Sequence, residues 1–524
     1  MTDHPGPGPG PVAIGLDLGT SSLKGVAVLS DGSVVARASA AYPTARPGPG
    51  AAEQRPADWL AAARAVIGAL AAEVPQARWS CIGLSGMLPT LVAAAADGTA
   101  IGAAITWEDG RAEEHGLRLR EAVGADALYA TTGQWVDGRY LLPAMARLRT
   151  TGDARGVAPR VLGAKDWLFE RLTLTPATDP STAAGFGCFS LATGTWDRAI
   201  VHAAFWDVPG GHPDNGADRT SAAMPDLPPV RPSTHTAPVT AVAGALLGLP
   251  VGLPVVLGAA DSVLAARGLG VTEPGRVAYV AGTSTVILGI APSLVVDPAH
   301  RFLVTPLERP GPVGLEMDLV ATGSAVGWLA ELLGLPAGDE AEIWRMAGEV
   351  APGADGLILL PYLGHGEQGA LWDPTLRGTL VGATLSHGRT HLARALLDGI
   401  VLESRRCLEV LHETTGVAGD IVVAGASAHS PAFTRTLADA TGRRVRWVDD
   451  PGHPASAWGA ATLALEALGL PVPASPRLAE GIAPDPGAAG PWRALWHRHE
   501  LARLALPAPR AAVPRTAGAT NAGS

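Results

Sequence analysis

Short apolar runs rich in β-branched residues alternate along the chain with longer Ala/Leu-rich segments of helical periodicity. In the first half this pattern predicts strands at 12–16, 81–84 and 91–95, and helices at 56–72, 109–123 and 161–174. The same alternation recurs in the second half over 277–288, 315–323, 357–360, 420–423 and 456–468, with a long helix predicted at 391–411. Such alternation is typical of an α/β protein in which mixed sheets are flanked by helices.

A short turn motif occurs twice, each time directly after an apolar run. The first copy is Asp17-Leu18-Gly19-Thr20-Ser21, and the second is Ala281-Gly282-Thr283-Ser284-Thr285, with an offset of 263 residues from Gly19 to Gly282. A second strand-like run, 23–29, follows the first copy, so the motif predicts a hairpin turn and not the loop-to-helix of a Walker motif. The constant offset indicates two halves of similar build.

The chemistry of this turn suits a phosphate ligand. Glycine lets the backbone approach closely, and the hydroxyls and turn amides donate hydrogen bonds to phosphate oxygens. A single Gly-Thr-Ser tripeptide is equally typical of an ordinary turn, so the interpretation rests on the repetition. Only the first copy carries a carboxylate, Asp17, where the second has Ala281. A carboxylate beside phosphates indicates a hydrated divalent cation.

A second carboxylate of interest, Asp261, follows the predicted buried strand 254–257 and a run of small residues. A carboxylate at such a position loses solvent on several sides yet stays within reach of a ligand, which suits a general base. Residues 263–266 have the composition of a helix start, and Asp is also favoured as a helix N-cap. Both roles remain open for Asp261, and they are compatible.

The length of the chain, 524 residues, with 47% hydrophobic residues, predicts at least two domains with large cores. Residues 207–233 are rich in Pro, Gly, Asp and Ser and indicate a surface excursion before the second half. We expect a tail at 1–11, an N-terminal domain at 12–250, a C-terminal domain at 251–505 and a second tail at 506–524. A cleft between the two domains is the expected ligand site.

Charge and composition restrict the partners. The net charge of −10 argues against nucleic acid and anionic membranes as partners. The uncharged stretch 237–260 is interrupted by prolines and predicts a short helix at 242–247 before the 254–257 strand, not a membrane span. With no signal-peptide pattern at the N-terminus, we expect a cytoplasmic protein. The three cysteines show no disulfide or metal-ligand spacing: Cys81, Cys188 and Cys407.

Five segments, in order, resemble the FGGY carbohydrate kinases, most closely xylulokinase-like members. They are 17–24, 107–111 (Trp-Glu-Asp-Gly-Arg), 258–261, 282–284 and 420–430. The resemblance covers about residues 12 to 470 and implies two actin-like ATPase (ribonuclease H-like) domains with an interdomain cleft. It further implies ATP-dependent phosphorylation of a hydroxyl of a small carbohydrate or polyol, for example a ketopentose such as xylulose. The partner implied is a small-molecule carbohydrate, and a homodimer is one state of assembly that the sequence allows.

Carried over residue by residue, the resemblance implies that Asp17 helps to hold Mg²⁺ and that Asp261 is the catalytic base. It places the sugar and phosphate side in the N-terminal domain, and the base and ATP side in the C-terminal domain. The residues implied to bind ATP and its phosphates are Gly19, Thr20, Ser21, Lys24, Gly282, Thr283, Gly425 and Ala426.

Trp107 and Asp109 fall where the family contacts its polyol, since an indole face covers C–H groups and a carboxylate accepts from hydroxyls. Core packing for Trp107 and helix capping for Asp109 remain open. The family's Gln-Met-His-Gly turn reads Gly86-Met87-Leu88-Pro89 here, so Leu88 and Pro89 present an apolar wall to the substrate and xylulose is disfavoured.

A second departure is that the family's Gly-Glu-Arg near the hinge reads Gly366-Glu367-Gln368, which removes a cation. These departures make a non-catalytic sugar or nucleotide sensor the alternative hypothesis. Retention of Asp17 and Asp261 argues against a sensor, because a sensor needs neither a metal nor a base. An actin-like or chaperone-type ATPase without a sugar site is the third hypothesis, and Trp107 with Asp109 argues against it.

Overall fold

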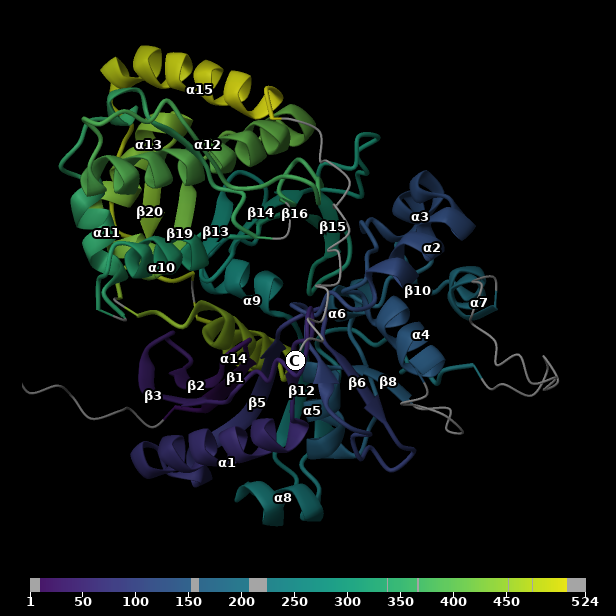
Figure 1. Ribbon diagram of the computed structural model, residues 1–524. Coiled ribbons are helices and arrows are strands. Elements are labelled where there is room, and N and C mark those ends of the chain that lie inside the picture. Colours follow the sequence, from purple (N-terminus) through teal and green to yellow (C-terminus); the bar gives the residue numbers. More distant parts are fainter. Residues whose placement is uncertain are drawn as a thin grey trace, which may run out of the picture.

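The computed structural model describes residues 10–151, 160–206, 224–336, 338–364, 367–450, 452–473 and 475–506. Two units, each built around a six-stranded mixed sheet, lie one above the other (Figure 1). The first sheet has the order β11-β12-β5-β1-β2-β3. Its strands are β1 (Val12–Leu18), β2 (Ser22–Leu29), β3 (Val34–Ala41), β5 (Trp79–Gly86), β11 (Thr236–Pro238) and β12 (Pro254–Ala260).

The second sheet has the order β15-β16-β14-β13-β19-β20. Its strands are β13 (Val277–Ala281), β14 (Thr285–Ala291), β15 (Leu303–Pro306), β16 (Val313–Leu319), β19 (Ile421–Gly425) and β20 (Val445–Trp447). Five consecutive strands of each sheet correspond: β3-β2-β1-β5-β12 in the first and β16-β14-β13-β19-β20 in the second. In both, the first three strands are antiparallel and the next two pairings are parallel. The duplication predicted from the repeated turn is confirmed.

Helices cover both faces of each sheet. The helices of the first unit are α1 (Pro56–Glu73), α2 (Glu113–Val123), α3 (Ala125–Thr132), α4 (Leu141–Thr151), α5 (Ala164–Thr173), α6 (Pro180–Ala184), α7 (Arg198–Trp206), α8 (Ala241–Leu247) and α9 (Asp261–Gly268). The later helices are α10 (Gly323–Leu332), α11 (Glu340–Ala347), α12 (Arg389–Thr415), α13 (Pro431–Thr441), α14 (Ala455–Ala467) and α15 (Ala489–Leu504). Smaller sheets are formed by β4 (Glu53–Gln54), β6 (Leu91–Ala94), β7 (Ala104–Ile105) and β8 (Arg160–Gly163); by β9 (Phe189–Ser190) and β10 (Thr195–Trp196); and by β17 (Ile358–Leu360) and β18 (Thr379–Val381).

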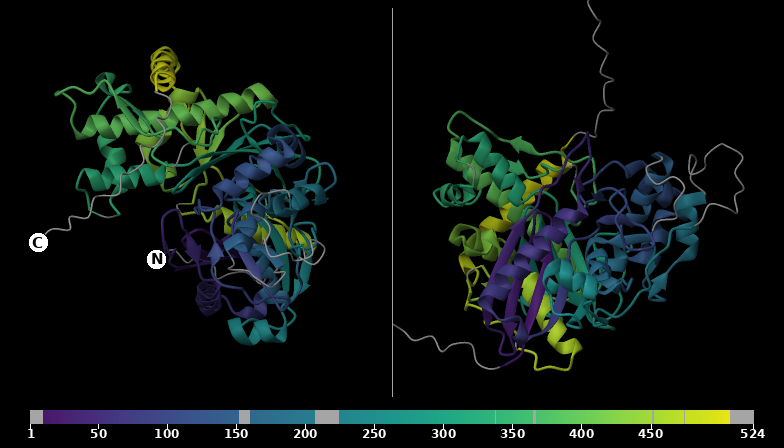
Figure 2. Two further views of the ribbon diagram at one scale, coloured as in Figure 1. Left: turned by 45° about the vertical axis from the view of Figure 1, so that its right-hand side comes forward. Right: turned by 90° about the horizontal axis from the view of Figure 1, so that it is seen from below.

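Helix α14 returns to the first unit although it lies late in the chain. In Figures 1 and 2 its yellow-green ribbon lies beside the purple strands of the first sheet. A Cβ atom at Gly15 or Gly83 would overlap the backbone carbonyls of Ala457 or Ala460, so these glycines let the helix lie directly on β1 and β5. Trp458 fixes the contact, because its Nε1 donates a hydrogen bond to the Gly32 carbonyl at 3.0 Å.

Several predictions about elements need correction. The helix predicted at 161–174 begins with strand β8, because Val161 and Leu162 pair with β6, and the helix starts only at Ala164. The helix predicted at 109–123 starts at Glu113. The 237–260 stretch holds α8 and β12, as predicted, and also most of β11, which was not predicted; no helix in the described ranges has the length and apolarity to cross a bilayer. Of the predicted tails and excursion, residues 1–9, 207–223 and 507–524 lie outside the described residues.

Strand β12 bears on the domain boundary. The expected division at 250/251 falls just before β12, which pairs with β5 and β11 inside the first sheet. Helix α9, which follows, packs against β12 and against the second sheet in one shared hydrophobic cluster that includes Ala259, Leu264, Leu288 and Val422. We therefore propose that the two units divide after α9.

Candidate active site

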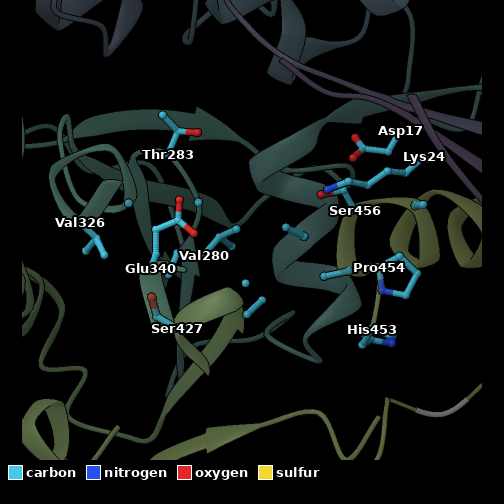
Figure 3. Close-up of a pocket in the computed structure, with 18 of the residues that line it drawn as sticks. Asp17, Lys24, Val280, Thr283, Val326, Glu340, Ser427, His453, Pro454 and Ser456 are labelled. Carbon is cyan, nitrogen blue, oxygen red and sulfur yellow. The ribbon is translucent and has the colours of Figure 1, made fainter. Parts of the chain in front are cut away.

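A cavity of about 480 Å³ lies where the two units meet (Figure 3). Asp17, Lys24 and Ser456 stand on one side of it, and Thr283, Glu340 and Ser427 stand on the other. Gly282 and Gly425 also line the cavity. The structure therefore brings together the first turn, the second turn and the β19 end, three of the segments singled out in the sequence.

Three parallel strand ends build the first side. Strands β1, β5 and β12 run parallel, so their carboxyl ends meet at one edge of the first sheet. In this register Asp17 lies beside Ser85, and Ala260 lies beside Gly86. Asp261 directly follows Ala260, and the two carboxylates consequently flank the end of β5.

Asp17 is a buried carboxylate with an incomplete set of partners. Its Oδ1 accepts a hydrogen bond from Ser85 Oγ at 2.8 Å, and its register partner across the hairpin is Lys24. Burial raises the pKa of Asp17, while the Ser85 hydrogen bond and the Lys24 charge oppose that rise. A buried anion of this kind is stabilised when a cation binds.

Asp261 occupies the first turn of α9. Ala260 is the N-cap, so Asp261 does not cap the helix. It lies in the first turn instead, where a carboxylate interacts favourably with the positive end of the helix. Its Oδ1 accepts a hydrogen bond from the Ser262 backbone N–H at 2.8 Å. Burial and then the charge of Asp17 raise the pKa of Asp261 to about 8. This half-buried group has a strongly shifted pKa, as catalytic acids and bases commonly do.

A buried polar network holds the strand end that carries Asp261. The Ala260 N–H donates to Ser181 Oγ at 2.9 Å, and Ser181 in turn is held by Asp179, the N-cap of α6. Lys165, which is 1% exposed, bonds Asp179 and Asp166 at 3.1 and 2.8 Å, and the Leu257 carbonyl of β12 at 3.2 Å. The network therefore contacts β12 at two points, through Ser181 at Ala260 and through Lys165 at Leu257.

The segments 165–167 and 179–181 agree with the family pattern in the sequence, but no role was assigned to them; the scarcity of lysine is a further signal. The chain contains two lysines, Lys24 and Lys165, while all its other strongly basic side chains are arginines. One lysine lies at the cavity and the other lies behind Asp261. Glu340 and Ser456, which line the cavity, were also missed, since no local motif distinguishes them, and Ser427 lies within the 420–430 segment but was given no role of its own.

The first hairpin turn is held rigidly. The Gly19 N–H donates to the Ser22 carbonyl at 3.1 Å, and Trp107 Nε1 donates to Thr20 Oγ1 at 3.0 Å. Gln54 Nε2 donates to the Thr20 carbonyl at 2.6 Å. Gly19, Thr20 and Ser21 form the link between the lining residues Asp17 and Lys24, and Trp107 contacts this turn.

The second turn is also held by backbone hydrogen bonds, but it is one residue shorter, since it joins Ala281 to Thr285 where the first joins Leu18 to Leu23. The Gly282 N–H donates to the Ser284 carbonyl at 2.8 Å, and the Thr283 carbonyl accepts from the Ser324 N–H at 3.0 Å, near the start of α10. Gly425 has φ of +95°, and a Cβ there would overlap the Ala281 carbonyl, so the end of β19 reaches the turn only as glycine. Ala426 follows as the first residue of a 3-10 turn.

The residues expected on the sugar side lie apart from this cavity. Asp109 is 2% exposed, and its carboxylate accepts from the Ala52 N–H at 2.9 Å and pairs with Arg111 at 2.6 Å. Leu88 packs against the hydrophobic cluster that contains α9, and the Leu88–Pro89 peptide is cis. A contact between sugar and Asp109, Leu88 or Pro89 stays a prediction.

Comparison with known proteins identifies relatives that match most of the chain. Residues 12–268 match the N-terminal domain model of the FGGY family of carbohydrate kinases, and residues 277–468 match the C-terminal domain model. A gluconokinase of Bacillus subtilis is 27% identical over 470 residues, 87% of each chain. A xylulose kinase of Escherichia coli is 26% identical over 458 residues, 86% of this chain and 89% of its own. The crystal structure of a xylulose kinase from Rhodospirillum rubrum, 32% identical, superposes with a TM-score of 0.81 and covers 94% of this chain and 98% of its own.

Proposed function

Because the chain belongs to the FGGY family of carbohydrate kinases, we propose that it transfers the γ-phosphoryl group of ATP to a hydroxyl of a small carbohydrate or polyol, with Asp261 as general base. The family consists of phosphotransferases that act on alcohol groups. The observation that carries the proposal is the meeting of Asp17 with both hairpin turns at one interdomain cavity, with Asp261 at the same sheet edge.

The residues around the cavity fit a magnesium nucleotide. The exposed backbone amide and hydroxyl of Thr283, with Lys24 opposite, supply donors for a polyphosphate. No cluster of three metal-ligating side chains occurs in the described part of the chain. Asp17 can serve as a ligand, since Mg²⁺ is commonly held by one or two carboxylates together with phosphates and water. When bound, the ion supplies charge neutralisation to the phosphates.

The proposed chemistry assigns Asp261 one task. The acceptor hydroxyl loses its proton to the Asp261 carboxylate, its oxygen forms the new bond to the γ-phosphorus, and the bond from that phosphorus to the ADP oxygen breaks. The raised pKa of Asp261 makes its carboxylate a better proton acceptor than an ordinary aspartate. The Ser181–Ala260 hydrogen bond fixes the strand end from which Asp261 projects.

The alternative of a non-catalytic sensor has no support from the comparisons, in which the relatives are named as kinases. Their names include xylulose kinase, gluconokinase and glycerol kinase, which supports the proposal that the acceptor is a small polyhydroxylated molecule.

The test is Mg²⁺-dependent ATP consumption with pentuloses, hexuloses, pentitols, glycerol and aldonates, each against a control without acceptor. We expect one acceptor class to stimulate turnover and Asp261→Asn to lower kcat about a hundredfold or more. Glu73→Gln, at an exposed position in the last turn of α1, is the matched control and leaves kcat unchanged. If Asp261→Asn keeps kcat within about tenfold of the parent, the assigned base is wrong.

A further inference from the structure

We infer that Asp318 of the second sheet accepts a hydrogen bond from a hydroxyl of the phosphoryl acceptor, and that this acceptor is an uncharged polyol or ketose and not a sugar acid. The inference rests on the proposed function and names the class of its second substrate. Sequence motifs did not single out Asp318.

The register of the second sheet directs Asp318 toward Asp261. Glu316 and Asp318 are two positions apart in β16, so both side chains lie on the same face of the sheet. Glu316 Oε2 accepts a hydrogen bond from Ser262 Oγ at 3.1 Å, and Ser262 is the neighbour of Asp261. Asp318 therefore faces the same side as the proposed base, one pleat nearer the carboxyl end of the strand.

Two neighbouring side chains on this face of the second sheet are partly exposed. Asp318 is the one partly exposed residue of β16, and Val286 is the one partly exposed residue of β14. The two are register partners, so their side chains project side by side from the same face. A carboxylate next to an apolar side chain suits a molecule that carries both hydroxyls and C–H groups. Asp318 Oδ1 is buried and has no hydrogen-bond partner, so it has an acceptor position to fill.

Arg139, which belongs to the first unit, is the cation whose charge acts on Asp318. Its guanidinium Nε donates to both oxygens of Asp137 at 3.0 Å, and Nη2 donates to the Gln368 side-chain oxygen at 2.7 Å when that amide is oriented to accept. Gln368 stands where the resemblance expects an arginine, and Arg139 of the first unit donates a hydrogen bond to its side chain. The positive charge of Arg139 is also felt by Asp318, whose pKa burial raises to about 6 against the lowering effect of Arg139.

The balance of charge disfavours an anionic acceptor. Arg139 is already paired with Asp137, while Glu316 and Asp318 of β16 and Asp261 at the start of α9 add carboxyl groups nearby. Burial and the Asp318 charge raise the pKa of Glu316 to about 8, as expected where acidic groups crowd together. The carboxylate of an aldonate would face the negative charge of Asp318, while the charge of Arg139 is already paired with Asp137; a neutral polyol instead donates a hydrogen bond to Asp318.

The test measures kcat and KM for xylulose, xylitol, glycerol and gluconate with the parent chain, Asp318→Asn and the control Glu331→Gln, which is exposed on α10. Calorimetric binding of the same four acceptors without ATP is measured in parallel, and circular dichroism melting verifies folding. We expect a neutral acceptor to be preferred, and Asp318→Asn to raise its KM about tenfold, because the amide that replaces the charged carboxylate accepts only a weaker, neutral hydrogen bond. Glu331→Gln leaves KM unchanged.

Preferred turnover of gluconate, or an unchanged KM in a folded Asp318→Asn, overturns the inference while the kinase function stands. Should Asp318→Asn fail to fold, the acceptor preference of the parent chain decides. If no acceptor is phosphorylated but a neutral one binds, and binds more weakly to Asp318→Asn, the inference holds and the proposed kinase function fails. Absence of both binding and turnover for all four acceptors overturns both.

Discussion

Asp17 and Asp261 stand at the ends of two parallel strands on either side of β5, and the negative charge of Asp17 adds to burial in raising the pKa of Asp261 to about 8. A general base must be unprotonated to act. We therefore expect kcat/KM for the acceptor to rise about tenfold per pH unit in acid solution and to level off above about pH 8. The measurement is a pH profile between 5.5 and 9.5 at constant ionic strength. A flat profile from pH 6 to 9 would contradict the assigned base.

Ser181 is expected to act on the reaction through the position of Asp261. Replacing it with Ala removes the acceptor for the Ala260 N–H and frees the end of β12. We expect Ser181→Ala to lower kcat several-fold to tenfold, while KM for ATP stays within about twofold, because the lost hydrogen bond does not touch the nucleotide turns. The control is Ser293→Ala, an exposed serine outside the site, which changes neither constant. A change confined to KM for ATP would refute this role.

Lys165 is expected to matter for stability. Lys165→Met leaves Asp166 and Asp179 buried without their cation, which costs about 3–5 kcal/mol of the free energy of unfolding near pH 7. Burial already raises the pKa of Asp166 against the opposing charge of Lys165. Removal of Lys165 raises it further, so the folded variant takes up protons that the unfolded chain does not yet bind. The loss in stability should therefore shrink as pH falls.

Urea unfolding of the parent and of Lys165→Met at pH 8 and pH 5.5 measures this effect. A loss below about 1 kcal/mol at pH 8, or a loss that grows in acid, would show that the ion pairs are not the reason for the buried lysine.

The scarcity of lysine makes the phosphate path open to chemical labelling. Lys24 is exposed and lines the cavity, whereas Lys165 is buried. An amine-selective reagent should therefore modify Lys24 in the folded protein, apart from the terminal amine, and leave Lys165 unmodified. We expect Mg-ATP to slow the labelling of Lys24 at least about fivefold, since a polyphosphate pairs with the ammonium group. Peptide mass spectrometry follows each site, and an equal rate with and without Mg-ATP would place Lys24 outside the nucleotide path.

The elements that the sequence predicted correctly are those with local causes. Gly19 and Gly282 predicted their hairpins, because the residues that determine a turn lie within about four positions of one another. The helix expected at 161–174 failed at its start, since Val161 and Leu162 pair with a strand 70 positions away. Asp318 was not predicted as a site residue, because its surroundings depend on the register of β14 and β16 and on Arg139 of the other unit. Such relationships arise only in the folded chain.

The position of α14 has a consequence for the synthesis of this protein on the ribosome. The face of the first sheet at Gly15 and Gly83 is covered by a helix that emerges roughly 440 residues after β1 begins. At a synthesis rate of about 5–20 residues per second, that face stays uncovered for on the order of 20–90 s before α14 is made. The first unit therefore completes its core only when nearly the whole polypeptide has left the exit tunnel, and until then its apolar strands need shielding by the nascent chain itself or by a chaperone.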